Sequence, residues 1–441
     1  MKIKRRTSAS EGRVSSTIAA PTSVENSNFT HLVADIAWFG MALAATSRFL
    51  TIYAIRVGAT PEQLSLLAAL PGIALLFATG FSGWWRRHYS TSVKALLWPG
   101  LGQRLMFLLP AFTPFFPSHW QPIWLIAAIT LTHIPTAVSG AIFVTMMGEA
   151  VSQPRMNTLL SHRSLALNVA IGFGALAFGI MLEHLPFPYN YQLMFFLSFV
   201  VAIVSMWHVG SVRVIFPSPV TIPVAKVNEV KRSGSIWSST SVMPVIITAF
   251  LTHAAFFSII SITPLHMVKN LGADEGFMML FSIAELGAGA LVATLTHHVI
   301  RRIGTQGLIS FAMAGTALSA VIFATATRLE FTLLAGAISG ASWTAAASVG
   351  LWSLFYERVS KEEADRASVA QQQAIALGIF VGPLIGGLLE SVNISLPIIL
   401  LMGAAIRLFV GFIMRWDIVS LIYPLATTKP SSALDGSSGG E

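Results

Sequence analysis

The chain has 441 residues, of which 54% are hydrophobic and only 10% are charged, and its mean hydropathy is +0.71. Soluble domains carry about 25% charged residues, so this composition excludes a soluble fold. The net charge of +8 does not indicate a nucleic-acid-binding protein, because the basic residues lie between apolar runs and not on one soluble face. The absence of cysteine excludes disulfides, thiol catalysis and cysteine metal sites.

Twelve apolar runs of about 20 residues follow one another and predict an all-α membrane protein with twelve transmembrane helices. The runs do not alternate as β-barrel strands do, which excludes a barrel. We expect the spans at residues 33–56, 62–83, 93–114, 121–148, 161–183, 190–210, 242–268, 273–298, 305–327, 329–356, 366–390 and 394–415. Residues 1–32 and 416–441 are expected to form disordered cytoplasmic tails, since no apolar run follows the N-terminus at signal-peptide distance.

The longest polar interruption, residues 211–241, divides the chain into two six-helix halves. Its sequence, SVRVIFPSPVTIPVAKVNEVKRSGSIWSSTS, contains three prolines and four basic residues, which disfavour a helix or a core. Residues 33–210 and 242–415 are therefore expected to form an N-terminal and a C-terminal bundle, joined by this cytoplasmic linker. The two halves repeat each other at matched positions, where a glycine is followed two residues later by an expected helix N-cap. The pairs are Gly58 with Thr60 in the first half and Gly272 with Asp274 in the second.

The distribution of lysine and arginine predicts the orientation. With the N-terminus inside, 21 of the 27 basic residues fall on the cytoplasmic side, three fall in outer loops and three lie inside spans. This bias favours a multi-pass protein of the bacterial plasma (inner) membrane with both termini in the cytoplasm.

Two motifs, together with this organisation, resemble the major facilitator superfamily over about residues 33–415. The loop after the second span, GFSGWWRRHYS from Gly80 to Ser90, has the basic pair of the family's G-x-x-x-D-x-x-G-R-R motif but lacks its acidic residue. The pattern G-x-x-x-G-P-x-x-G-G, which exporters of the family carry in span five, lies here in span eleven, at Gly378, Gly382, Pro383, Gly386 and Gly387. The resemblance implies two bundles that rock about a central substrate site.

Charged residues inside spans cost at least about 2.5–3.5 kcal/mol each, so they need a partner or a water-filled cavity. Glu285, in the middle of span eight, is the candidate for proton coupling, and a fixed ion pair is the alternative interpretation. Arg48, Arg104 and Arg407 are its possible partners, and the sequence does not select among them. The candidates for substrate binding are Arg48, Arg104, Gln371 and Trp343.

Several other polar residues have both a structural and a functional interpretation. Asp35 is interpreted as an acidic residue at a helix N-terminus, and His133 and His253 as hydrogen-bonded structural histidines. Glu149 and Glu357 occupy matching places at cytoplasmic ends and are expected to pair with basic loop residues such as Arg155 and Arg358. The candidates for gating are Glu149, Glu357, Arg86, Arg87, Arg301 and Arg302.

No enzyme motif, metal site or nucleotide-binding loop is present, so we expect no catalysis and no cofactor. The sequence predicts a secondary transporter that moves a small organic molecule by alternating access, with protons as the candidate coupling ion. Membrane lipids are also expected partners, and nucleic acid is not. The alternative is a substrate-sensing or lipid-handling protein of the same fold without coupled transport.

Overall fold

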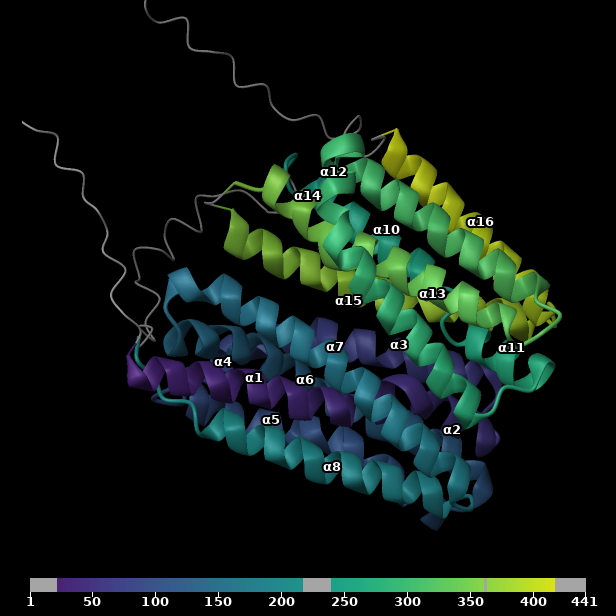
Figure 1. Cartoon of the computed structure of the whole chain (residues 1–441), viewed down its shortest axis with the longest axis horizontal. Helices are drawn as coiled ribbons and strands as arrows, with labels where there is room; N and C mark the ends of the chain where they lie inside the picture. Colours follow the sequence, from purple (N-terminus) through teal and green to yellow (C-terminus); the bar gives the residue numbers. More distant parts are fainter. Residues whose placement is uncertain (1–21, 217–238, 361–362, 417–441) are drawn as a thin grey trace, which may run out of the picture.

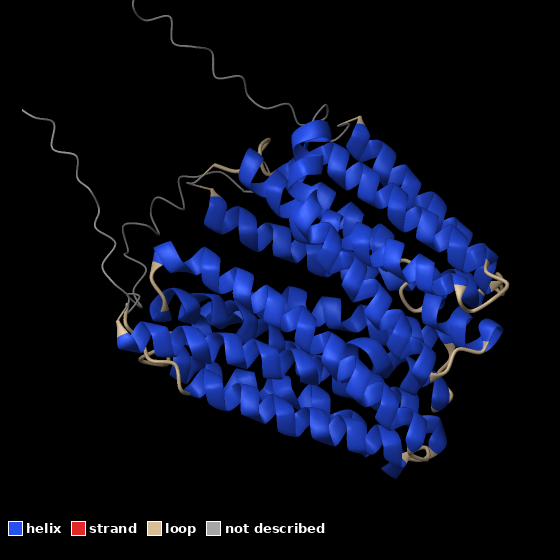
Figure 2. Cartoon of the chain, viewed as in Figure 1, coloured by secondary structure: helices blue, strands red, loops and turns tan. Residues whose placement is uncertain are grey.

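The computed structural model of the protein describes residues 22–216, 239–360 and 363–416, and within these ranges every regular element is a helix (Figure 2). The helices of the first half are α1 (Ser23–Ala44), α2 (Leu50–Arg56), α3 (Pro61–Ala78), α4 (Ser82–Arg86), α5 (Ser92–Leu108), α6 (Gln121–Ala150), α7 (Gln153–His184) and α8 (Tyr189–Gly210). Those of the second half are α10 (Met243–Phe257), α11 (Ile262–Leu271), α12 (Glu275–Thr325), α13 (Phe331–Trp343), α14 (Leu351–Arg358), α15 (Ala364–Ser391) and α16 (Leu396–Arg415). Short 3₁₀ or π turns connect several of them, at Ala45–Phe49, Thr79–Phe81, Leu109–Phe115, Ser118–Trp120 and Thr344–Gly350.

These helices make twelve passes, as the sequence predicts. The longest helix, α12, bends at Gly304, whose φ of 73° breaks the helix and turns one long element into two passes. Eleven helical stretches in the described ranges are long and apolar enough to cross a membrane. The remaining pass is α5, which is only 17 residues long and continues as a 3₁₀ turn.

The two halves form two bundles that lie side by side (Figure 1). The bundles diverge toward the end where the linker leaves α8 and rejoins α10, which we call the linker end. They meet toward the opposite end, which we call the far end. There α3 packs against α15 and α7 packs against α12.

Glycine makes the contact between the bundles close. A Cβ atom on Gly72 of α3 would lie 2.6 Å from the carbonyl oxygen of Ala376 in α15. A Cβ atom on Gly179 of α7 would lie 2.7 Å from the Cβ of Met279 in α12. Close helix approach at small residues therefore joins the halves, as in other membrane bundles.

The repeated helix starts are confirmed. Thr60 and Gln63 form a reciprocal capping box, with distances of 2.9 and 3.3 Å between backbone nitrogens and side-chain oxygens. Asp274 accepts a hydrogen bond from the amide of Phe277 at 2.8 Å. Gly58 and Gly272, which share a register in the two halves, both have positive φ, at 85° and 74°.

The predicted start of the first helix at residue 33 is wrong, because α1 begins at Ser23. Thr22 caps it by accepting from the amide of Glu25. Glu25 and Asn28 are buried polar residues whose side chains bond to Ser152 and to the carbonyl oxygens of Ala150 and Arg213. The expectations for residues 1–21, 417–441 and most of the linker lie outside the described residues.

Candidate functional site

Two chambers lie between the bundles, on either side of one ion pair. The linker-side chamber has a volume of about 320 Å³ and includes Ser164 and Asn168 of α7 and Trp343 and Ser348 from the second half. The far-side chamber has a volume of about 180 Å³ and includes Thr51 from the first half and Phe256, Met267 and Phe281 from the second. Both chambers share Arg48 and Glu285.

The ion pair joins the two halves of the chain across 237 positions of sequence. Nη1 of Arg48 donates to Oε2 of Glu285, and both side chains are partly buried, with 17% and 23% of their surface exposed. Of the three arginines that the sequence offers as partners, Arg48 is the one that neutralises Glu285. The Nε atom of Arg48 is buried and has no hydrogen-bond partner within the described ranges.

Both π-helical segments of the described chain border the linker-side chamber. The first, Ala45–Phe49, contains Arg48, and the second, Thr344–Gly350, contains Ser348 and directly follows Trp343. A π bulge inserts an extra residue into a helix and re-aims the side chains that follow, and such bulges are frequent at functional sites. Local backbone geometry thus turns Arg48 and Ser348 toward the space between the bundles.

Trp343, a candidate for substrate binding, is held by two aromatic neighbours. Its ring lines the linker-side chamber and stacks on Phe256, with a centroid distance of 3.8 Å and an interplanar angle of 17°. His253 meets the edge of the same indole at 5.0 Å, and its Nδ1 hydrogen-bonds the carbonyl of Ala249. Part of the Trp343 ring is therefore fixed by packing, while another part faces the chamber.

A second inter-bundle ion pair closes the far end. Arg56 of α2 donates from Nε and Nη2 to the two carboxylate oxygens of Glu275 in α12, at 3.0 and 2.9 Å. Tyr191 of α8 donates its hydroxyl to the same carboxylate at 2.9 Å and stacks on Tyr53. We call Arg56, Glu275 and Tyr191 the far-end latch. The sequence does not predict it, because its members lie on three helices that are far apart in the chain.

Arg104 lies away from the chambers, in the interior of the first bundle. Its guanidinium donates to the carbonyl oxygens of Gly100 and Ala202 and to the hydroxyl of Ser205. Its Nη2 is 3.6 Å from Asp35. Arg104 is 4% exposed, so the substrate contact expected for it would require a rearrangement of this network.

Asp35 is a central group of that network, and its interpretation as a helix N-terminal charge is wrong. Because α1 begins at Ser23, Asp35 lies three turns inside the helix, where it accepts from Ser205 at 2.7 Å and from Arg163 at 3.3 Å. The span expected here starts at residue 161, only two residues before Arg163, but α7 begins at Gln153 and carries Arg163 into the bundle.

Arg407 is buried without an ion pair in the described chain. It donates to the carbonyl oxygens of Ala255, Phe256 and Thr316 at 3.3, 2.6 and 2.9 Å, and it lies over the Phe256 ring. It also lines the far-side chamber. Arg407 therefore brings a positive charge to the wall of the site.

Three of the gating candidates, Arg86, Glu149 and Glu357, are bonded within their own bundles. Arg86 donates to Glu149 at 3.1 Å, so the expected pairing of Glu149 with Arg155 is wrong, and Arg155 lies near Glu25 instead. The reason is that α4 turns Arg86 under the end of α6, where the Glu149 carboxylate also accepts from the amide of Ser92. Arg87 directly follows α4.

In the second bundle, Thr305 donates to Glu357 beside the bend of α12. Glu357 lines a small polar cavity with Arg358 and Arg415. Arg301 and Arg302 are exposed at the same end of the bundle. In this arrangement Arg86–Glu149 and Thr305–Glu357 each tie helices of one bundle together.

Two further polar candidates, Gln371 and His133, lie outside the chambers. Gln371 is fully buried in α15, and neither its oxygen nor its nitrogen has a partner among the described residues. His133 hydrogen-bonds the carbonyl of Ile129 in its own helix at 2.7 Å, which agrees with the structural interpretation.

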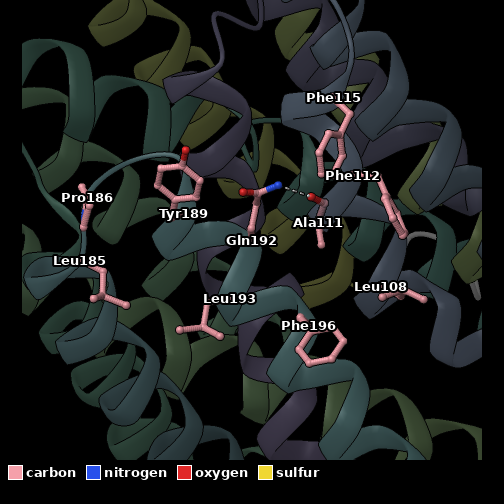
Figure 3. A pocket seen from close by; sticks show the side chains of 10 residues that line it. All are labelled: Leu108, Ala111, Phe112, Phe115, Leu185, Pro186, Tyr189, Gln192, Leu193 and Phe196. Atoms are coloured by element: carbon pink, nitrogen blue, oxygen red, sulfur yellow. Dashed lines mark hydrogen bonds between the residues drawn. The ribbon is translucent and has the colours of Figure 1, made fainter.

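An apolar pocket lies on the first bundle alone. It has a volume of about 520 Å³ at the far ends of α5 and α8 (Figure 3). Phe112, Phe115 and Phe196 form much of its wall. Gln192 also lines it, and the side-chain amide of Gln192 donates to the carbonyl oxygen of Ala111. No charged residue lines it, and it has no wall from the second bundle. Its position suits a lipid-facing surface better than a substrate pathway.

Comparisons with known proteins bear on this architecture. The family description "Major Facilitator Superfamily" matches residues 37–383. The inward-open xylose transporter XylE from E. coli aligns with a TM-score of 0.67 at 12% identity, over 89% of this chain and 96% of that one. The POT family transporter PepTSo gives 0.68 at 11% identity, over 90% and 98% of the two chains. The nucleoside transporter NupG gives 0.64 at 12% identity, over 90% and 99%.

No curated protein matches the sequence. Identities this low show a shared fold alone, whereas the family match covers more than half of the chain and confirms the resemblance drawn from the motifs. With its twelve helical passes and the chambers between its two bundles, the chain belongs to the Major Facilitator Superfamily and is a multi-pass membrane transporter, not an enzyme.

Proposed function

We propose that the protein is a secondary active transporter that moves a small organic molecule through the two chambers by alternating access. The observation that carries the proposal is the Arg48–Glu285 pair. It links the two bundles and separates a chamber on the linker side from one on the far side. A substrate that enters either chamber meets the same two charged residues, Arg48 and Glu285. Alternating access requires such a site, which can be reached from each side of the membrane in turn.

The arrangement of contacts supports a state that is closed at the far end. The Arg56–Glu275 pair and the α3–α15 contact lie there, whereas the ribbons separate toward the linker end (Figure 1). We place the linker end and both termini in the cytoplasm, because the excess of lysine and arginine lies on that side. The membrane that we propose is the bacterial inner membrane.

Glu285 is the proposed site of proton coupling. Its carboxylate lies midway along the first pass of α12, beside both chambers. Among the described residues it has one cationic partner, which belongs to the other bundle. Protonation would release Arg48 and remove an ionic link between the bundles. Proton binding and the rocking motion would then be coupled through one contact.

Glu285→Gln tests this mechanism in proteoliposomes. The amide keeps the shape of the side chain but cannot bind or release a proton at neutral pH. We expect the variant to lose uptake driven by a pH gradient and to keep exchange of substrate across the membrane. Glu330→Gln, which changes an exposed carboxylate at the start of α13, serves as the control. Unchanged gradient-driven uptake by Glu285→Gln would refute coupling at this residue.

A second candidate function is sensing or handling of lipids without coupled transport. The apolar pocket on the first bundle and the missing acidic residue of the loop after span two favour it. In this case a bound ligand would stabilise the purified protein, while neither exchange nor net flux would occur in proteoliposomes.

A further inference from the structure

The charged residues of the two chambers do not balance. Among the described residues that line either chamber, Arg48 and Arg407 are positive and Glu285 is negative. The other lining residues have aliphatic, aromatic, thioether, amide or hydroxyl side chains, or are glycine. The site therefore holds one net positive charge when Glu285 is ionised. An unbalanced charge inside a membrane protein is costly, and ligands of opposite charge relieve it.

The charge of Arg407 is not neutralised by its neighbours. All three of its hydrogen bonds go to backbone carbonyl oxygens, which orient the guanidinium but carry no formal charge. Its side chain is 4% exposed, so water screens it poorly. In such surroundings one charge influences a ligand over several ångströms. Arg407 thus raises the electrostatic potential of the far-side chamber while it stays hydrogen-bonded to the three carbonyl oxygens.

Arg48 is the group that can bind an anion directly. It uses Nη1 for Glu285, while its Nε–H is buried without a partner. The Nε edge of a guanidinium presents two parallel donors, which match the two oxygens of a carboxylate. Arg48 can therefore hold Glu285 and a ligand carboxylate at the same time.

The other residues that line the far-side chamber indicate the chemistry of the rest of the ligand. Phe256, Ile260, Met267, Phe281 and Phe323 supply an apolar lining. Five hydroxyl residues also line the chamber, namely Ser47, Thr51, Thr263, Ser282 and Ser339. The hydroxyls of Thr263 and Ser282 donate to carbonyl oxygens four residues earlier in the chain. Apolar walls with a few polar groups suit a ligand with a hydrocarbon or aromatic body.

We propose that the transported substrate is an organic monocarboxylate with an apolar body, whose carboxylate binds Arg48 and whose charge is balanced by Arg407. This proposal rests on the proposed transport function and names its substrate class. A single carboxylate brings the charge of the site to zero with Glu285 ionised. A phosphate monoester, with a charge near −2, would over-neutralise it.

The first test uses pairs of probes that differ only in charge. Benzoate, phenylacetate and hexanoate are compared with their primary amides at millimolar concentration, by thermal unfolding of the purified full-length protein. We expect at least one carboxylate to raise the melting temperature by a few degrees while its amide does not. Arg48→Gln should weaken that binding roughly 30-fold. Arg328→Gln, which removes the same charge from an exposed position, should leave it unchanged.

The second test does not depend on the choice of apolar body. Glu285→Ala leaves Arg48 without its carboxylate and opens space beside it. Formate or acetate should then restore the lost thermal stability, and chloride at equal ionic strength should not. If neither the wild-type protein nor this variant distinguishes a carboxylate from its neutral or chloride control, the proposal is overturned.

Transport assays separate this inference from the function on which it rests. Arg48-dependent exchange of a carboxylate, but not of its amide, in proteoliposomes supports both. Exchange of a neutral or cationic solute that carboxylates do not inhibit would overturn the substrate class and leave the transport function intact. Carboxylate binding without any exchange or flux would retain the site and refute transport.

Discussion

Three arginines inside the helical bundles are stabilised in three different ways. Arg48 has a carboxylate partner from the other bundle, Arg104 has a shared carboxylate and a hydroxyl within its own bundle, and Arg407 has only carbonyl oxygens. An ion pair between two bundles that move relative to each other can break, and a ligand can replace one partner. A network inside one bundle instead holds the helices of that bundle together. The partner, and not the residue type, therefore distinguishes a candidate functional arginine from a structural one.

The Asp35 network gives a prediction at this scale. Asp35→Asn leaves Arg104 and Arg163 buried without their shared carboxylate, and breaking a buried pair costs about 3–5 kcal/mol. We expect a loss of that order in the free energy of unfolding, measured by denaturant titration in mixed micelles. Arg163→Gln and the double variant complete a cycle. If the two single losses simply add, Asp35 and Arg163 are not coupled and the network is wrong.

At the scale of elements, glycine determines which helices can touch. Along α15, Gly378 and Gly382 face α10, and a Cβ atom at either position would lie 2.8 Å from the nearest atom of α10. Gly386 faces Ser258, which directly follows α10, and a Cβ atom there would clash with it. The nearest atom at Gly382 and Gly386 is a carbonyl oxygen, of Ala254 and Ser258. The pattern that exporters of the family carry in span five here builds the core of the second bundle.

A pair of glycine substitutions tests that packing. Gly386→Ala forces a Cβ against the rigid backbone oxygen of Ser258, so α10 and α15 must separate, and we expect a clear fall in melting temperature. Gly172→Ala in α7 meets no atom within 4 Å, and alanine favours a helix over glycine by about 1 kcal/mol. Gly172→Ala should be neutral or stabilising. Equal effects of the two substitutions would contradict the close α10–α15 contact.

The helices and their local starts could be predicted from the sequence, because they depend on neighbouring residues. The apolar runs, the Thr60 and Asp274 caps and the positive-φ glycines are of this kind. The partners of Glu285 and Asp35 could not be predicted, since they lie on helices distant in the chain. The start of α1 was missed because Glu25 and Asn28 look like exposed tail residues until the ends of α6 and α8 cover them.

At the scale of the whole molecule, two ion pairs join the bundles at different distances from the far end, and we assign them different roles. Arg48–Glu285 lies between the chambers, where a substrate can reach it. Arg56–Glu275 lies at the far end, with 44% of the arginine and 12% of the glutamate side chain exposed. We infer that the deeper pair responds to the ligand and that the far-end latch adjusts the balance between the two open states.

Opening of the far end should depend on that latch. Arg56→Gln removes a partly exposed pair, which is worth about 0.5–1 kcal/mol, so the population open at the far end should rise roughly two- to fivefold. Because the chain has no cysteine, spin labels can be attached to introduced cysteines without removing native ones. Labels at Glu62 and Ser391 report on the far end, and labels at His88 and Tyr356 report on the linker end.

Alternating access requires these two distances to change in opposite directions. In Arg56→Gln the far-end distance should shift to longer values while the linker-end distance shifts to shorter ones, measured by pulsed electron resonance in lipid nanodiscs. Lys269→Gln removes a nearby exposed charge that has no ion pair in the described chain, and it should leave both distributions unchanged. If the far end opens while the linker end stays fixed, the latch only anchors the ends of α2 and α12. The bundles would then not move as two rigid bodies about the chambers.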